Sequence, residues 1–386
     1  IIQDPQRRLQ KGHPWVVGSQ VLRVQGDPAP GDIVRVIDAK KGPVGQGYYN
    51  PASQIRVRML TRSVDVPIDD GFFRERIRRA WDLRQRTLPD ATSVRVVFGE
   101  SDGLPAFIAD KFNDVLVLQT LSLGIERWKE TLVETLRELI APRGIYERND
   151  VAVREKEGLQ QHKGFIGDAF DTRLTIEEND LKFSIDVATG QKTGHFLDQR
   201  LNHAAMRMIS DGSEVLDCFT HTGGFALHAA RYGAKGVLGL DISKDAVELA
   251  KANAALNGLG DRCTFEAQNV FDFLADASRQ GRRWEVIVLD PPAFAKNRAS
   301  IDNAVRGYKE INLRAIKCLP PGGFLVTCSC SFHMGPDLFR ETVAKAAVDA
   351  GRIVREVYAG AQPPDHPILW GAPETHYLKC LVLQVL

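Results

Sequence analysis

From residue 214 onward, short apolar runs alternate with helical patterns, and this alternation constrains the fold more than any other feature. The runs are EVLDCF (214–219), GVLGLD (236–241), CTFEAQNV (263–270), EVIVLDPP (285–292) and GGFLVTCSCS (322–331). Between the second and third runs, residues 243–259 have helical periodicity, with Ser243 as N-cap and Gly258 near the end. Buried strands that alternate with helices predict a parallel, doubly wound sheet.

Polar residues at the strand ends are the first site candidates, because ligands of such sheets bind outside the carboxyl ends of the strands. Four of the predicted strands end at Asp217, Asp241, Asn269 and Asp290, and the fifth ends in the Ser/Cys cluster at 328–331. We therefore expect these groups to lie along one edge of the sheet.

The loop after the first of these strands discriminates between two adenosine cofactors. Asp241 ends the second strand 24 residues after Asp217, a position from which a carboxylate can bind ribose hydroxyls. A dinucleotide site also needs G-x-G-x-x-G against a pyrophosphate, whereas this loop reads DCFTHTGGF (217–225). A ligand with an adenosine, a cationic amino-acid group and no phosphate fits better, so S-adenosylmethionine is favoured over NAD. In that interpretation Asp217 lies near the amino-acid end, Asp241 at the ribose and Asn269 at the adenine, and the alternative is that Asp217 only caps the next helix.

The fourth strand ends in DPPAFAKN (290–297), a rigid loop because each proline fixes φ and removes a donor. Such a loop can present the carboxylate of Asp290 to a planar base. By itself it is compatible with methylation of an exocyclic amine, with Phe294 stacking on the base. Phe294 is nearly as often explained by packing within the loop.

Cys328 and Cys330 point to the same side of an extended strand, and Cys330 lies nearer the carboxyl end. Carbon 5 of cytosine accepts a methyl group only after a thiolate has added to C6. Asp290 is suited to hold or supply a proton at N3 meanwhile. Zinc is disfavoured by the one-residue spacing and the lack of a second cluster, and a disulfide here would be strained. The remaining alternative is that both cysteines are inert core residues.

The N-terminal part has a different pattern. Alternating strands at 32–38 and 54–60 suggest a small β barrel, and residues 69–88 form an amphipathic helix rich in arginine. An α+β module follows, with a hairpin turning at Asn113-Asp114, a helix over 125–140 and strands near 144–148 and 181–187. Residues 1–90 hold 16 Lys or Arg against 10 Asp or Glu, a net charge of +6 that points modestly to nucleic acid.

The remaining composition suggests a cytoplasmic protein. No apolar run is long enough to predict a transmembrane helix, and the charged first residues lead us to expect no signal peptide. The six cysteines are scattered as expected for reduced thiols. The oligomeric state is open, with a homodimer as one option.

Taken together, these motifs resemble the RlmI-type large-subunit ribosomal RNA cytosine-C5 methyltransferases over essentially the whole chain. The segments that carry the resemblance are KGHPWVVGSQV (11–21), GQKTGHFLDQR (190–200), DCFTHTGGFALHAA (217–230), LDPPAFAKN (289–297), RGYKEINLRAI (306–316) and SCSF (329–332). The resemblance implies an α/β protein with a PUA-like RNA-binding β barrel (1–66), a central α+β domain (67–189) and a Rossmann-like class I methyltransferase domain (190–386).

The resemblance also implies roles for single residues. Cys330 is the expected nucleophile. Asp290 is its expected catalytic partner and is also expected to lie next to the cofactor. The expected cofactor contacts are Phe196, Gln199, Asp217, Phe219, Gly223, Asp241, Asn269 and also Asp290. Ala293 stands where the broader RNA cytosine-C5 group has a second cysteine and the commonest form of the family has Lys, so the base that removes the C5 proton is open. A cysteine at position 328 is also unusual for the family.

We therefore expect an S-adenosylmethionine-dependent enzyme that forms 5-methylcytosine in 23S ribosomal RNA through a covalent bond from Cys330 to C6, without a metal. One alternative keeps the fold but methylates an exocyclic amine of RNA. Another is a non-catalytic RNA-binding assembly factor, and an NAD oxidoreductase is the least favoured.

Overall fold

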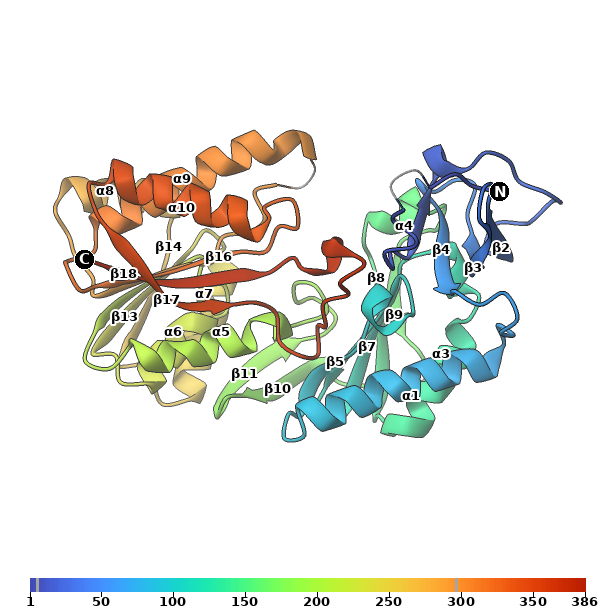
Figure 1. The fold of residues 1–386 in the computed structure, drawn as a ribbon. Coiled ribbons are helices and arrows are strands. Elements are labelled where there is room, and N and C mark those ends of the chain that lie inside the picture. The colour runs from blue at the N-terminus through green and yellow to red at the C-terminus, as the bar shows by residue number, and fades with distance from the viewer. Residues whose placement is uncertain (5–6, 296–297) are drawn as a thin grey trace. The chain divides into compact units, whose positions relative to one another are not determined.

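The computed structural model describes residues 1–4, 7–295 and 298–386, which divide into two units. Unit 1 consists of Ile1–Ile176, Ile185–Leu197 and Pro364–Thr375, and unit 2 of Glu177–Ser184, Asp198–Pro363 and His376–Leu386. Both units are drawn in Figure 1. Within the described ranges, no helix has the length and apolar character needed to cross a membrane.

Unit 2 contains the sheet that the alternating apolar runs predict. Its strands are β12 (Glu214–Cys218), β13 (Gly236–Asp241), β14 (Cys263–Ala267), β15 (Val286–Leu289), β16 (Phe324–Ser329), β17 (Val354–Gly360) and β18 (Lys379–Val385). They are ordered β14-β13-β12-β15-β16-β18-β17. The five predicted strands are parallel, whereas β18 runs antiparallel to both β16 and β17. The prediction of a doubly wound sheet is confirmed, with an antiparallel strand added beside β16.

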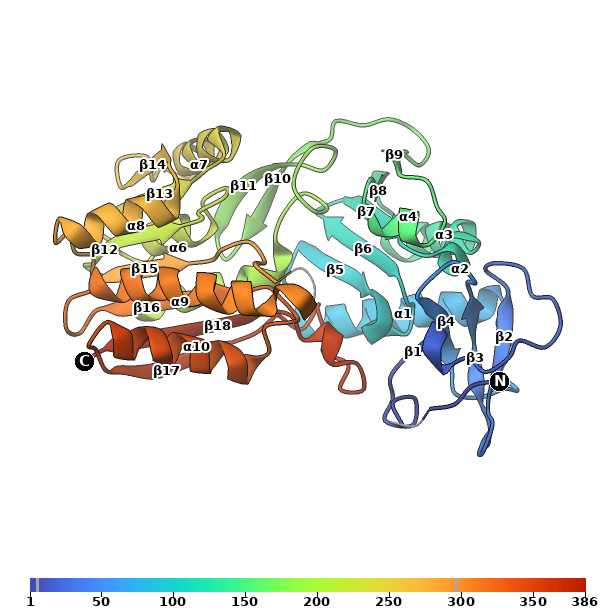
Figure 2. The same ribbon diagram turned by 90° about the horizontal axis from the view of Figure 1, so that it is seen from above.

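Helices cover both faces of this sheet, as the views in Figures 1 and 2 show. On one face lie α5 (Arg200–Ala205), α6 (Gly224–Arg231) and α7 (Lys244–Leu256), and on the other α8 (Val270–Arg279), α9 (Ile301–Lys317) and α10 (Pro336–Asp349). The predicted N-cap of α7 is present, because the Ser243 hydroxyl accepts from the backbone N–H of Ala246. Because the helices cover the two faces of the sheet, the carboxyl ends of the parallel strands are lined by loops.

Unit 1 contains two sheets. The N-terminal one is antiparallel, in the order β1-β4-β3-β2, with strands β1 (Trp15–Val17), β2 (Ile33–Asp38), β3 (Gly42–Tyr49) and β4 (Ile55–Thr61). The second has the order β5-β6-β7-β8-β9, with β5 (Ser93–Phe98), β6 (Phe107–Phe112), β7 (Val115–Thr120), β8 (Gly144–Asn149) and β9 (His162–Phe165). The predicted turn at Asn113-Asp114 joins β6 and β7, and Asn113 has a φ of +53°.

The helices of unit 1 are α1 (Asp70–Thr87), α2 (Leu123–Glu126), α3 (Lys129–Ile140) and α4 (Val153–Lys156). The single helix expected over 125–140 is divided into α2 and α3, because Trp128 leaves the helical conformation and packs its ring on Phe73. A further hairpin, β10 (Arg173–Glu178) and β11 (Leu181–Asp186), turns through Asn179-Asp180, both with positive φ, and its residues 177–184 belong to unit 2.

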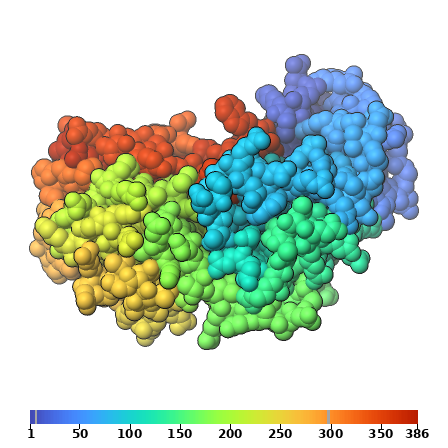
Figure 3. All heavy atoms as spheres, turned by 90° about the horizontal axis from the view of Figure 1, so that it is seen from below, coloured from blue at the N-terminus to red at the C-terminus, as the bar shows by residue number. Residues whose placement is uncertain are grey.

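The arginine-rich helix α1 is confirmed, but most of its positive charge is used within unit 1. Its solvent side is light blue in the view from below (Figure 3). Five of its six arginines contact carboxylates or carbonyls, namely Arg74, Arg76, Arg78, Arg79 and Arg84. The excess of arginine in this segment is therefore weaker support for nucleic-acid binding than the sequence suggests.

Arg84 makes the most buried of these contacts, and replacing it should destabilise the protein. Its guanidinium donates to both carboxylate oxygens of Asp102 (2.6 and 2.8 Å) and to the carbonyl of Asp365 (2.8 Å). Arg84→Met leaves the Asp102 carboxylate buried without its cation, and we expect a loss of about 3–5 kcal/mol in the free energy of unfolding. Urea denaturation measures this, and Arg78→Met, which removes an exposed pair with Glu75, should change it by less than about 1 kcal/mol. Equal effects of the two variants would contradict the prediction.

Candidate active site

The loop between β12 and α6 has an unusual backbone. Phe219 and His221 have φ of +64° and +51°, and Gly223 follows with +92°. Positive φ is uncommon outside glycine and is often retained at functional sites. Gly224 is required for a different reason, since a Cβ there would lie 2.6 Å from Nε2 of His203. Gly223 is therefore needed for a left-handed turn, and Gly224 for a close approach to the buried ring of His203. Phe219 is the first residue after β12, and its ring is half-buried.

Asp217 lies at the carboxyl end of β12 and is fully buried. Its Oδ2 accepts from the Thr220 hydroxyl (2.6 Å) and from the backbone N–H of Ala226 in α6 (3.0 Å). The carboxylate thus does cap the next helix, as the alternative interpretation proposed. Its Oδ1, however, is buried and has no hydrogen-bond partner among the described residues. Burial, together with the nearby charge of Asp290, raises the pKa of Asp217 to about 7.

Asp241 and Asn269 both sit at strand ends and hold the backbone of their loops. The carboxylate of Asp241 accepts from the backbone N–H of His221 (3.0 Å) and of Ser243 (2.9 Å). The exposed Asn269 is the N-cap of α8, where its side chain accepts from the N–H of Phe271 (2.9 Å). A carboxylate oxygen has more than one acceptor site, so Asp241 can still accept ligand hydroxyls.

Asp290 follows β15 and is joined to Gln199. The side-chain amide of Gln199 donates to Oδ2 of Asp290 (2.9 Å), and its oxygen accepts from the Asn202 amide (2.6 Å). Gln199 and Asn202 are buried, so this chain of hydrogen bonds fixes the orientation of the Asp290 carboxylate. Two residues of the predicted loop motif, Lys296 and Asn297, lie outside the described residues.

Cys330 is placed next to the same loop. It follows the last residue of β16, and its sulfur lies 4.0 Å from the carbonyl oxygen of Pro291. The neighbouring Ser331 donates to the carbonyl of Ala295 (2.7 Å), which ties the two loops together. Cys330 is half-buried, whereas all five other cysteines are buried. The structure therefore brings an accessible thiol to the D-P-P loop.

Cys328 differs from Cys330 in its surroundings. It lies within β16, fully buried, and is paired in register with Cys380 of β18. Burial raises the pKa of the Cys328 thiol well above its ordinary value, so it is a neutral thiol at physiological pH. This environment suits a core residue and not a nucleophile.

Two aromatic candidates have other contacts than a base would make. Phe294 packs on Tyr308 (ring centroids 4.6 Å apart) and on Phe271 (6.0 Å), contacts of the kind that the packing alternative expects, and its stacking on a base stays a prediction. Phe196 belongs to unit 1, where the ammonium group of Lys192 lies 4.4 Å from its ring centroid. A cofactor contact by Phe196 stays a prediction.

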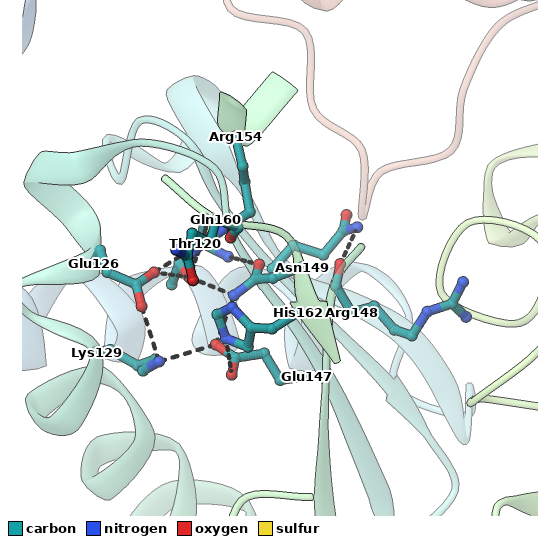
Figure 4. A network of polar contacts seen from close by, with 10 residues as sticks. Thr120, Glu126, Lys129, Glu147, Arg148, Asn149, Arg154, Gln160 and His162 are labelled. Carbon is teal, nitrogen blue, oxygen red and sulfur yellow. Dashed lines mark hydrogen bonds and ion pairs between the residues drawn. The ribbon is translucent and has the colours of Figure 1, made fainter. Parts of the chain in front are cut away.

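Two groups of side chains have the composition of a metal site. Glu178, His203 and His228 are buried in unit 2, where His203 Nδ1 lies 2.6 Å from Glu178 and the ring supports the glycine loop. In unit 1, Glu126 and Glu147 approach His162 (Figure 4), but the ammonium of Lys129 lies 2.9 and 3.2 Å from these two carboxylates. A lysine already occupies the place of a cation there.

Sequence reasoning missed three residues around this site, namely Asn202, His203 and Lys379. Asn202 and His203 lie on α5, one turn after the predicted Gln199, and periodicity alone did not distinguish them from core positions. Lys379 begins β18, a strand that the sequence pattern did not predict.

Comparisons with known proteins agree with this geometry. A family model for S-adenosylmethionine-dependent methyltransferases matches residues 160–378, and one for PUA-like domains matches residues 3–62. A ribosomal RNA large subunit methyltransferase I from Alteromonas mediterranea is 41% identical over 390 residues, which cover 100% of this chain and 98% of the relative. The chain belongs to the ribosomal RNA large subunit methyltransferase I family.

Two further similar proteins also match nearly the whole chain. The methyltransferase I from Shewanella amazonensis is 43% identical over 384 residues, covering 98% of this chain and 97% of the relative. The crystal structure of SMU.776, a methyltransferase complexed with SAH, has a TM-score of 0.85 at 19% identity and covers 98% of this chain and 97% of its own. At that identity the likeness concerns the fold alone.

Membership of the methyltransferase I family establishes S-adenosylmethionine as the cofactor and excludes the NAD alternative. The residues fit this cofactor, because Asp217 offers a buried carboxylate oxygen without a partner among the described residues, which suits a cationic amino group. The strand-end carboxylate of Asp241 suits ribose hydroxyls.

Proposed function

We propose that this enzyme methylates carbon 5 of a cytosine in 23S ribosomal RNA through a covalent bond between Cys330 and C6 of the base. The observation that carries the proposal is the accessible Cys330 thiol beside the D-P-P loop, with its sulfur 4.0 Å from the Pro291 carbonyl. An enzyme that methylates an exocyclic amine needs the loop but no thiol there. The relatives' name supports ribosomal RNA of the large subunit as the substrate.

In this mechanism the Cys330 thiolate adds to C6, and the electron pair of the C5–C6 double bond moves onto the ring. Asp290, oriented by Gln199, holds a proton at N3 as negative charge builds there. S-adenosylmethionine supplies the methyl group that C5 takes up. Loss of the C5 proton to a base then re-forms the double bond, and the sulfur of Cys330 leaves C6 as thiolate, which regenerates the enzyme.

We assign the cofactor contacts to the loops of unit 2. Asp217 binds the amino group, Asp241 the ribose and Asn269 the adenine end. Phe219 and Gly223 shape the loop against the cofactor, and Gln199 and Asp290 border it. The contact expected from Phe196, a residue of unit 1, stays a prediction. The support for these assignments is their position at or next to the carboxyl ends of β12 to β15 or in the segment before β12.

The RNA-binding part of the proposal is based on the match of residues 3–62 to PUA-like domains. The division into domains at residues 66 and 189, a cytoplasmic location and a homodimer stay predictions.

Mapping of 5-methylcytosine in 23S ribosomal RNA tests the proposal. We expect one modified cytosine to be lost in a strain without this gene and restored by the wild-type gene. A methyl group on an exocyclic amine instead would support the N-methylation alternative. An unchanged methylation pattern, together with RNA binding, would support the assembly-factor alternative.

A further inference from the structure

Lys379 is a buried lysine at the edge of the site. It is the first residue of β18, pairs in register with Ser329 of β16, and is only 4% exposed. Its ammonium donates to the carbonyl of Ser331 (2.5 Å) and to the carbonyl of Tyr377 (2.8 Å). No carboxylate in the described part of the chain pairs with it. A buried ammonium without a carboxylate is costly, so a compensating role is expected.

The ionisable groups around this ammonium are mostly thiols. Cys328 of β16 and Cys330, which follows that strand, interact electrostatically with Lys379, and the charge of Lys379 also acts on His376. Burial lowers the pKa of Lys379 to about 8, which still leaves most of it charged at pH 7. Tyr308 of α9 and Asp290 after β15 are further acidic groups near Cys330, since the charges of Cys330 and Asp290 both act on Tyr308 and the Cys330 sulfur lies 4.0 Å from the Pro291 carbonyl.

We propose that Lys379 is a positioning residue that favours the thiolate form of Cys330 in the resting enzyme. Two carbonyls fix the ammonium, and one of them belongs to Ser331, the residue next to the nucleophile. A fixed cation beside a thiol favours loss of the S–H proton to water, while the ammonium keeps its own protons. This inference rests on the proposed role of Cys330 as nucleophile and adds an explanation of how its thiolate is stabilised. The negative charge of Asp290 disfavours that thiolate, and the charge of Lys379 counteracts this effect.

The test measures the thiolate directly by alkylation. Native protein is treated with iodoacetamide from pH 6 to pH 10, and the modified Cys330 peptide is quantified by mass spectrometry. The other five cysteines are buried, so the folded protein should react at Cys330, and Cys330→Ala provides the blank. Lys379→Gln keeps two N–H donors for the carbonyls but removes the charge, and Lys379→Arg keeps the charge. Lys251→Gln removes an exposed lysine of α7 as a matched control.

We expect the pH of half-maximal alkylation to rise by about one unit in Lys379→Gln, a roughly tenfold loss of thiolate at pH 7. Lys379→Arg should restore most of the reactivity, and Lys251→Gln should leave the profile unchanged. An unmoved profile in Lys379→Gln, in protein that still binds S-adenosylmethionine in calorimetry, would overturn the inference.

A wild-type measurement keeps the test decisive if the variants fail to fold. The wild-type profile should then have its midpoint below the ordinary thiol value of about 8.5, and a midpoint at or above that value would overturn the inference. The outcome is independent of the proposed reaction. If Cys330 responds to Lys379 but never forms an adduct with RNA, the proposed function fails while the electrostatic pairing stands.

Discussion

Cys330→Ala should abolish the covalent adduct that the wild-type enzyme forms with RNA containing 5-fluorocytosine. Fluorine at C5 cannot leave as a proton does, so the bond from sulfur to C6 persists after methyl transfer. Without the thiol, addition to C6 cannot begin, and we expect methyl transfer to fall by at least about 10⁴-fold. The adduct is measured by denaturing electrophoresis with labelled RNA and S-adenosylmethionine.

Cys328→Ala is the matched control, because it removes a thiol two residues away on the same strand. Cys328 is fully buried and its thiol pKa is raised well above the ordinary value, so it should be dispensable for the adduct. Thermal unfolding of both variants checks that the fold is kept. If Cys328→Ala lost the adduct and Cys330→Ala retained it, the two cysteines would have to exchange roles.

Asp217→Asn should weaken binding of S-adenosylmethionine by about 10- to 100-fold, the effect of losing a charge-assisted hydrogen bond. Asparagine has the same shape and can still accept from Thr220 and the N–H of Ala226, so the helix cap is kept. Wild-type affinity should rise by up to about tenfold per pH unit as the pH approaches 7 from below, because a cationic ligand requires the ionised carboxylate. Isothermal calorimetry measures both effects, and the variant should show no such rise.

The Asp217 carboxyl group should lower the stability of the folded protein as the pH rises, whereas it should raise the affinity for the cofactor. Its folded pKa of about 7 lies above the ordinary value of 3.8, so the native state binds the proton more tightly than the unfolded chain. Its contribution to stability is therefore complete below about pH 4 and falls as the pH rises to 7. Asp217→Asn should gain stability relative to wild type over this window, by on the order of 4 kcal/mol in total. A constant difference between the two proteins across the window would refute the raised pKa.

Periodicity predicted the elements whose burial is set by local pattern. The five parallel strands of unit 2, the N-cap of α7 and the turn at Asn113-Asp114 follow from short-range rules of burial, capping and turn chemistry. The strand β18 was missed although its residues KCLVLQV are mostly apolar, because a short apolar run does not reveal that it inserts antiparallel between β16 and β17.

The hydrophobic and charge patterns of the sequence could not predict which groups the charged side chains contact. Arginine spacing on α1 indicated a basic face, but Arg84 and Arg74 are neutralised by carboxylates from other segments of unit 1. Likewise Phe294 faces Tyr308, which lies 14 residues later in α9. Such pairs depend on the three-dimensional register of elements, which single-residue properties do not encode.

The sequence by itself determined the chemistry that this chain can hold: strand-end acids, a D-P-P loop and a cysteine at the end of the fifth strand. These are local features, since the order of residue types along each strand sets which side chain reaches the edge of the sheet. Only the tertiary structure decided which cysteine is accessible, which oxygen of Asp217 stays without a partner among the described residues, and that the Lys379 ammonium binds the carbonyl of Ser331, the residue after Cys330. These properties depend on burial and on pairing with β18, and both arise only when segments far apart in the chain pack together.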